Sequence, residues 1–199
     1  MKLIIASNNK GKIREIKEIL GTHFESVISM KEAGIELDVV EDGKTFLENA
    51  AKKANETLAL AAEDVAVLAD DSGLEVDALD GAPGVYSARF AGEGHDDNAN
   101  NSKLLELMQN VPDEKRGANF ACAMVLARHN KPNIEAVGKC YGKILHESAG
   151  ENGFGYDPLF YSTEENASFA QIPADRKNAI SHRRRAIEGI CKQLDEEKK

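Results

Sequence analysis

The sequence has 199 residues, 42% of them apolar, with 25 Lys and Arg against 34 Asp and Glu, which gives a net charge of −9. This length and apolar content allow a sizeable core and argue against a disordered chain. The negative charge argues against binding to nucleic acid through a broad cationic surface. An acidic protein can still bind an acidic ligand if it concentrates its cations at one place or recruits a metal.

No segment has the pattern of a membrane helix or of a secretory signal. The longest apolar run, residues 120–127, is far shorter than the roughly 20 residues that span a bilayer. The apolar stretch 3–6 is too short for a signal peptide. The three cysteines lack the Cys-x-x-Cys spacing of zinc ribbons, and we expect them to be core residues of a cytoplasmic protein: Cys122, Cys140 and Cys191.

The first third of the chain predicts a strand and two helices. Residues 3–6 form a short apolar run, and apolar residues then recur at helical spacing over 13–20, with Gly21 as a stop. A second amphipathic helix is predicted over 46–61. Thr45 and Glu48 have the spacing of a capping box at its start.

The remainder alternates between strands and helices. A buried strand over 65–69 is expected to close at Asp70, with 74–77 as a possible continuation, and a helix is expected over 97–110. Two further strands are predicted, 120–126 and 134–141, the first of them central in the sheet. An amphipathic helix ends the chain. With no repeat and no linker, this pattern predicts a single α/β domain over 1–199 with a mixed sheet.

Familiar nucleotide-binding motifs are incomplete in this sequence. Gly43-Lys44-Thr45 resembles the end of a P-loop, but Asp38 stands where that motif requires glycine. Gly-x-Gly pairs begin at Gly92 and Gly153 without the third glycine of a dinucleotide site. These mismatches exclude both sites.

Four polar clusters interrupt the apolar pattern. The loop 7–12 precedes a helix, where backbone N–H groups and lysines favour an anion, although an ordinary helix cap has the same composition. Asp70 and Asp71 follow a strand and suit a hard cation, with Glu41 or Asp42 as a further ligand. A solvated turn is the alternative.

The other two clusters lie near the C-terminus. Residues 153–158 combine two glycines, two aromatics and an acid, which suits either the stacking of a planar base or a tight turn. Residues 180–185, with Lys177 one turn earlier, form the densest cationic cluster of the chain. A solvated helix face would have the same composition.

Taken together, these segments resemble the inosine triphosphate pyrophosphatase family, which acts on non-standard purine nucleotides such as ITP, dITP and XTP. The resemblance covers nearly the whole chain. It rests on ordered blocks at residues 6–12, 41–50, 69–74, 81–89, 154–158 and 179–183.

The resemblance implies hydrolysis of a nucleoside triphosphate to the monophosphate and pyrophosphate, with Mg²⁺, by a homodimer. It also implies an elongated, twisted mixed β-sheet flanked by helices, in two lobes with a central cleft. Small purine nucleoside triphosphates are then the expected partners, and neither nucleic acid nor a membrane is expected.

By position, the resemblance assigns roles to individual residues. Asp71 is the expected catalytic base, and the expected metal ligands are Glu41, Asp70 and Asp71. The residues expected to hold the triphosphate are Ser7, Asn8, Asn9, Lys10, Gly11, Lys12 and Lys53, and Ser72 is expected to contact the substrate. Phe154 is expected to stack on the purine, and the residues expected along its edge are Asp157, Lys177, His182 and Arg183. Gly155 and Tyr156 are further expected substrate-binding residues.

Two other functions are weighed against this one. A nucleotide sensor without catalysis would use the same scaffold, but the retained carboxylates argue against it. Binding of nucleic acid through Lys177 and residues 183–185 is disfavoured by the acidic chain, which lacks a broad basic face.

Overall fold

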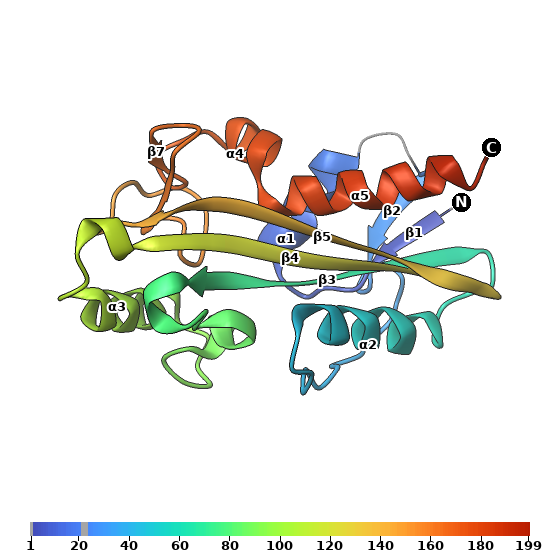
Figure 1. The fold of residues 1–199 in the computed structure, drawn as a ribbon. Helices are drawn as coiled ribbons and strands as arrows, with labels where there is room; N and C mark the ends of the chain where they lie inside the picture. Colours follow the sequence, from blue (N-terminus) through green and yellow to red (C-terminus); the bar gives the residue numbers. More distant parts are fainter. Residues whose placement is uncertain (1, 21–23) are drawn as a thin grey trace. The chain divides into compact units, whose positions relative to one another are not determined.

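The predicted strands and helices alternate along the chain and form an open mixed sheet with helices on its faces. A computed structural model describes residues 2–20 and 24–199. Its strands are β1 (Lys2–Ile5), β2 (Ser26–Ser29), β3 (Val65–Val76), β4 (Gly117–Arg128), β5 (Lys131–Ile144), β6 (Phe160–Ser162) and β7 (Ala167–Ser168). Among these described residues the seven strands follow the order β2-β1-β3-β4-β5-β6-β7 (Figure 1).

Five α-helices and three short 3₁₀-helices complete the described part of the chain. The α-helices are α1 (Lys10–Leu20), α2 (Phe46–Leu58), α3 (Asp97–Met108), α4 (Ala174–Ile180) and α5 (His182–Glu196). The 3₁₀-helices are η1 (Asp77–Leu79), η2 (Gly84–Arg89) and η3 (Asp113–Lys115). No helix of the described residues is long and apolar enough to cross a membrane.

The chain divides into two compact units. The first contains Met1–Asp71, Cys122–Gly138 and His182–Lys199, and the second contains Ser72–Ala121 and Lys139–Ser181. Three strands, β3, β4 and β5, therefore contribute residues to both units. The single domain expected over 1–199 and the expected central cleft stay predictions.

In the first unit, helices cover both faces of a parallel sheet segment. β1 pairs in parallel with β2 and with β3, where Ile5 is the partner of Leu68. Successive side chains of a strand point to opposite faces, so Leu68 packs among residues of α1 and α5, whereas Val67 packs with α2. Figure 1 shows α5 and α2 on opposite sides of the strands.

The sequence signals for the first two helices are confirmed. α1 turns its buried residues Ile16 and Leu20 toward the core at helical spacing. At the start of α2, the Thr45 side chain accepts from the Glu48 backbone and the Glu48 side chain accepts from the Thr45 backbone, which completes the capping box. The expected stop at Gly21 lies outside the described residues.

One predicted boundary is wrong, because β3 does not close at Asp70. It continues without interruption to Val76 and includes the segment Asp70-Asp71-Ser72-Gly73. The strand that ends here is β1, whose last pair is Ile5 with Leu68. The two aspartates thus lie just beyond the carboxyl end of β1, within a longer neighbouring strand.

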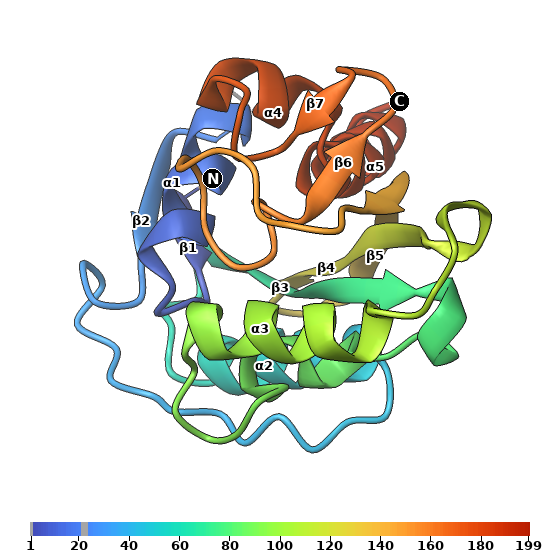
Figure 2. The ribbon, with the colours of Figure 1, turned by 90° about the vertical axis from the view of Figure 1, so that its left-hand side faces the viewer.

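The second unit has an aromatic core. The rings of Phe120 and Phe160 lie 4.7 Å apart between centroids, and Phe169 stacks on Phe120 at 5.9 Å. Leu104 and Met108 of α3 are fully buried in the same cluster. Figure 2 shows α3 along one side of this unit, with β6, β7 and α4 on the other.

The long strands β4 and β5 were predicted, but both are longer than the sequence indicated. They are joined by the two-residue turn 129–130, where Asn130 has a positive φ of 57°. β4 lies between β3 and β5, which confirms that it is central. The predicted helices over 97–110 and at the end of the chain are confirmed as α3 and α5.

Candidate active site

Asp70 and Asp71 stand next to each other on β3, and their side chains are held from opposite faces of the sheet. Asp70 contacts Lys12 of α1, with 3.0 Å between Nζ and Oδ2. Asp71 accepts a hydrogen bond of 2.9 Å from Nδ2 of Asn49, a residue of α2. This follows from the alternation of a strand that lies between the two helices.

Asp70 is surrounded by cations. Besides Lys12, the guanidinium of Arg183 lies 3.8 Å from its Oδ2. Burial alone raises the pKa of the Asp70 carboxyl, but the charges of Lys12, Arg183 and Lys53 outweigh it and hold the pKa below its usual value. Asp70 is therefore ionised in a fully buried position, where it fixes two of the residues predicted to bind substrate.

Arg183 also pairs with a second buried acid, Glu15 of α1. Both side chains are almost completely buried, and the pair joins the first turn of α5 to α1. Burial lowers the pKa of Arg183, but Glu15 and Asp70 more than compensate and raise it. A permanent cation shared by two buried carboxylates holds this part of the first unit together.

The start of α5 comes very close to β5 at Gly138. A Cβ atom at this position would lie 2.2 Å from the carbonyl oxygen of His182 and 2.5 Å from the backbone nitrogen of Ala186. Only glycine leaves room for this approach. Gly138 thereby determines how closely the first turn of α5, which carries His182 and Arg183, packs on β5.

Asn49 connects Asp71 to the loop before α2. Its Oδ1 accepts a hydrogen bond of 2.8 Å from the backbone nitrogen of Gly43, while its Nδ2 donates to Asp71. A Cβ at Gly43 would lie 2.6 Å from that same Oδ1, so a side chain there would displace the amide. Asn49 is almost completely buried and has both ends of its amide fixed.

The pKa of Asp71 moves in the opposite direction from that of Asp70. Burial raises the pKa of the Asp71 carboxyl and the nearby charge of Glu41 adds to the rise, against the opposing effects of Lys53, Lys12 and the Asn49 hydrogen bond. Two adjacent carboxylates thus have different affinities for a proton. Asp71 is the one suited to accept a proton.

Glu41 and Asp42 have different surroundings. Glu41 accepts a hydrogen bond of 2.9 Å from Nζ of Lys53, a mostly buried lysine. Asp42 instead pairs at 2.7 Å with Lys52, in a far more exposed position. Burial lowers the pKa of Lys53, but Asp70, Asp71 and Glu41 together raise it. Of the two acids, Glu41 is the one electrostatically coupled to Asp71.

The loop predicted to hold phosphates is ordered by its own side chains. Oγ of Ser7 accepts from the backbone nitrogen of Asn9 at 3.2 Å, and Oδ1 of Asn9 accepts from that of Lys12 at 3.1 Å. These contacts place Lys12 in the first turn of α1, directed at Asp70. Asn8 and Gly11 belong to the same short segment, and Asn8 is exposed.

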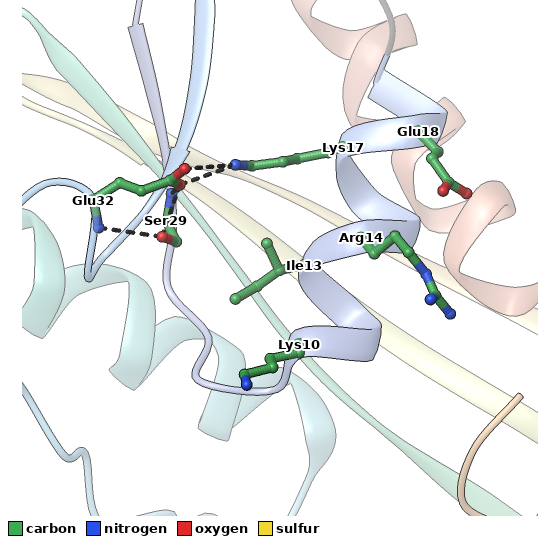
Figure 3. Close-up of a pocket in the computed structure, with 7 residues that line it drawn as sticks. All are labelled: Lys10, Ile13, Arg14, Lys17, Glu18, Ser29 and Glu32. Atoms are coloured by element: carbon green, nitrogen blue, oxygen red, sulfur yellow. Dashed lines mark hydrogen bonds and ion pairs between the residues drawn. The ribbon is translucent and has the colours of Figure 1, made fainter.

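Lys10 of this loop lines a shallow pocket of about 410 Å³ beside α1. The pocket is formed by Lys10, Ile13, Arg14, Lys17, Glu18, Ser29 and Glu32 (Figure 3). In Figure 3, Lys17 reaches across to Glu32, which also accepts a hydrogen bond from the Ser29 hydroxyl.

A second group of predicted residues gathers in the second unit. Nζ of Lys177 donates to Oδ2 of Asp157 at 2.6 Å and lies 4.7 Å from the ring centroid of Phe154. The backbone nitrogen of Phe154 donates to the same Oδ2 at 2.9 Å. Asp157 and Lys177 are both almost completely buried. A cation, an anion and an aromatic ring from the predicted base site are thus brought together, and their contacts with a purine stay predictions.

Glycine is required at position 153 for this arrangement. Gly153 has a φ of +79°, and a Cβ there would lie 2.0 Å from Oδ2 of Asp157. Any side chain would strike the carboxylate that holds Lys177. Tyr156 is anchored separately, because its hydroxyl donates to the carbonyl of Ser87 at 2.8 Å.

Three further predicted residues are placed individually. Ser72 follows Asp71 on β3 and belongs to the second unit. His182 and Arg183 are buried in the first unit, at the start of α5. Their predicted contacts with the purine edge stay predictions, as does that of Ser72 with the substrate.

The oxygen donors present suit a hard divalent cation. Among the described residues, no group of three or more His, Cys, Asp or Glu side chains is arranged as a complete metal site. Magnesium does not need such a cage, since it commonly binds one or two carboxylates together with phosphate oxygens and water. Asp71 and Glu41 fit that pattern better than Asp70, which Lys12 and Arg183 hold.

Two residues with clear roles here were missed by the sequence analysis. Asn49 and Glu15 are polar residues within amphipathic helices, and both are buried. The available signal in the sequence was a polar residue at a helical position next to the apolar stripe. Their partners, Asp71 and Arg183, are 22 and 168 positions away in the sequence.

Comparisons with known proteins place the chain in a family. A model of the Ham1 family matches residues 3–193. The dITP/XTP pyrophosphatase of Clostridium perfringens is 54% identical over 193 residues, which cover 95% of each chain. That of Vibrio cholerae is 43% identical over 199 residues, which cover 99% of this chain and 98% of the relative.

Solved structures agree with the sequence comparison. The Staphylococcus aureus Ham1 protein has a TM-score of 0.87 and 42% identity, over 99% of this chain and 100% of that one. A dITP/XTP pyrophosphatase from Mycobacterium abscessus has a TM-score of 0.75 and 38% identity, over 93% and 96%. The mixed sheet flanked by helices and the family resemblance are confirmed, and the chain belongs to the Ham1 family.

Proposed function

We propose that this protein is a pyrophosphatase that hydrolyses non-standard purine nucleoside triphosphates to the monophosphate and pyrophosphate. The observation that carries this proposal is the grouping of Asp71, Glu41 and Asp70 with Lys12 and Lys53 at the carboxyl end of β1. Relatives that match 94–95% of this chain are named dITP/XTP pyrophosphatases, which supports the same activity.

The lysines suit the triphosphate, which is a polyanion. Lys12 and Lys53 are mostly buried, so their charges are screened less than those of exposed lysines. The ordered loop 7–12 adds backbone N–H groups at a helix start, where anions are favoured. These groups would hold the phosphates and stabilise charge that develops on them during hydrolysis.

Magnesium is the proposed cofactor, and Asp71 and Glu41 are the residues that would hold it. Asp70 is less suited to this role, because its charge is already balanced by Lys12 and Arg183. When bound, the ion would polarise a phosphoryl oxygen and neutralise charge on the leaving pyrophosphate. Asp71 is also the proposed base, as the family resemblance implies, and its carboxylate would accept the proton of the attacking water.

The bond changes are those of a simple hydrolysis. Water attacks one phosphorus of the anhydride between the α- and β-phosphates, and the bridging P–O bond breaks. One proton of the water passes to Asp71. The monophosphate and pyrophosphate leave as separate products, so no orthophosphate is released.

The second-unit group suits a purine with a 6-keto oxygen. Lys177 is a donor only, so it can donate to that oxygen but not accept from the 6-amino group of adenine. Phe154 would stack on the base, and Asp157 holds Lys177 in position. A mispaired buried donor costs about 1–3 kcal/mol, so a few such contacts give a strong preference for hypoxanthine and xanthine over adenine.

We further propose a homodimer, as the family resemblance implies, and a location in the cytoplasm. Light scattering of the purified protein tests the dimer, with a monomer mass as the contradicting result. Fractionation of cells that express the chain tests the location.

The substrate preference is tested by steady-state kinetics with Mg²⁺ on ITP, XTP, GTP and ATP, following pyrophosphate release. We expect kcat/KM for ITP and XTP to exceed that for ATP by at least about a hundredfold, which corresponds to two or more mispaired contacts. Equal values for all four nucleotides would contradict the proposed base recognition.

A further inference from the structure

Helix α3 holds the loop 153–158 through two hydrogen bonds to Gly155, one to its backbone N–H and one to its carbonyl oxygen. Oδ2 of Asp97 accepts a hydrogen bond of 2.7 Å from the backbone nitrogen of Gly155. Nδ2 of Asn101 donates a hydrogen bond of 2.9 Å to the carbonyl oxygen of the same residue. We call Asp97 and Asn101 the α3 clamp.

The clamp restricts both backbone torsions, φ and ψ, of Gly155, and glycine is the residue type with the greatest conformational freedom. The φ and ψ angles of Gly155 are the rotations between its two flanking peptide planes. Asp97 holds the first plane through its N–H, and Asn101 holds the second through its C=O. Gly155 has a φ of +62°, and a Cβ there would meet nothing within 4 Å, so its surroundings do not constrain it sterically.

The helix that carries the clamp is itself firmly anchored. Asp97 and Asn101 are four residues apart and so lie on one face of α3. Leu104 and Met108 bury the following turns in the core. Between the clamp residues, Asn100 accepts from the backbone nitrogen of Ala91 at 2.7 Å and donates to the carbonyl of Ala88 at 3.1 Å.

The clamped peptides adjoin the side chain expected to contact the base. The plane held by Asp97 is the peptide between Phe154 and Gly155, so it sets the direction in which the Phe154 ring leaves the backbone. Asp157 holds the backbone nitrogen of Phe154 on the other side. The backbone on both sides of Phe154 is therefore held by two carboxylates, one from its own loop and one from α3.

We propose that Asp97 and Asn101 are positioning residues that hold the Phe154 ring for base recognition and thereby contribute to selectivity among purines. This inference rests on the proposed function, because it takes Phe154 as the residue that stacks on the base. Without the clamp, the loop would sample several ring positions, and binding would have to select one of them.

The test uses Asn101→Leu, which removes the donor at similar volume, and Asp97→Ala, which removes the acceptor. Asp97→Asn is the conservative variant, since its amide oxygen still accepts from Gly155. Asn98→Ala, at the exposed neighbouring position, is the control. Loss of one such hydrogen bond changes affinity by up to about tenfold.

We expect Asn101→Leu and Asp97→Ala to raise KM for ITP by about tenfold with little change in kcat, and to lower the ratio of kcat/KM for ITP over ATP. Inhibition by inorganic pyrophosphate, which has no base, should keep its wild-type constant. Asp97→Asn should restore most of the selectivity. A purely structural role would lower all activities and the melting temperature together.

Either of two kinetic outcomes would overturn the inference. One is that both variants keep the wild-type KM for ITP and the wild-type selectivity. The other is that pyrophosphate inhibition weakens in parallel with KM. Hydrogen–deuterium exchange of peptides that contain Gly155 is a readout independent of turnover, and it should accelerate in both variants. If the wild-type protein released no pyrophosphate from any nucleotide, the proposed function would fail, and with it the link between the clamp and selectivity. If hydrogen–deuterium exchange at Gly155 were unchanged in both variants, the clamp itself would be rejected.

Discussion

Asn49 donates a hydrogen bond of 2.9 Å to Asp71 from the opposite side of the sheet to the Asp70 cluster, and both residues are buried. The same amide accepts from Gly43, so its orientation is fixed at both ends. Asn49→Asp keeps an acceptor for Gly43 but replaces the donor to Asp71 with a second carboxylate, which repels it. We expect activity to fall by about 10–100-fold, the usual effect of losing a residue that orients a metal-binding carboxylate. Kinetics across a range of Mg²⁺ concentrations measure it, and wild-type activity would show that Asp71 needs no such support.

Asp71 itself is expected to be required for turnover. Asp71→Asn removes the proton acceptor but keeps an acceptor oxygen for Asn49, so the site should stay folded. We expect kcat to fall below detection, while ITP binding measured by equilibrium dialysis stays within about tenfold of wild type. Asp42→Asn is the matched control, because Asp42 pairs with Lys52 in an exposed position. Normal turnover in Asp71→Asn would assign the base to another residue.

The buried pair of Arg183 with Glu15 is expected to stabilise the first unit. Arg183→Leu leaves Glu15 and Asp70 buried without this cation, which should lower the free energy of unfolding by about 3–5 kcal/mol. Arg184→Leu breaks an exposed i,i+4 pair with Glu188 and should cost about 0.5 kcal/mol or less. Urea unfolding of the two variants measures the difference. Equal losses would mean that the buried cluster does not stabilise the fold.

The pocket beside α1 predicts a pH-dependent contribution to stability. The Ser29 backbone N–H, and then Lys17, lower the pKa of Glu32 from 4.5 to about 2. A carboxyl whose pKa is lowered by folding contributes stability that is fully present above its unfolded pKa. The contribution is lost as the pH falls from 4.5 toward 2. The Lys17 contact is 2.9 Å long and visible in Figure 3.

This contribution is measured by comparing wild type with Glu32→Gln in urea unfolding between pH 2 and pH 7. We expect wild type to be more stable at pH 7 and the difference to vanish near pH 2. Glu63→Gln, at an exposed position before β3, is the control for a general effect of charge. A difference that does not vary with pH would contradict the prediction.

The sequence predicted the long elements well and the short ones poorly. The apolar stripes of α1 and α2 have the helical period, and β4 is a continuous apolar run. The structure of these elements therefore follows from local pattern. β2, β6 and β7 have only two to four residues each and depend on the neighbouring strands for their pairing. The end of β3 was misplaced because aspartates resemble a strand terminus, whereas pairing within the sheet continues past them.

The site was predicted where polar residues follow an apolar run, as at Asp71, or combine rare residue types, as in the loop 153–158. It was not predicted where a single polar residue stands inside a helix. Asn49 and Glu15 have no local pattern that identifies their partners, since those partners come from distant parts of the chain. The same is true of Asp97 and Asn101, whose contact with Gly155 spans more than fifty positions.

The products of ITP hydrolysis test the central claim most directly. Incubation of the purified protein with ITP and Mg²⁺, followed by ³¹P NMR, distinguishes the two anhydride bonds. We expect inosine monophosphate and pyrophosphate to appear in equal amounts, with no orthophosphate. Formation of inosine diphosphate and orthophosphate would contradict the proposed function.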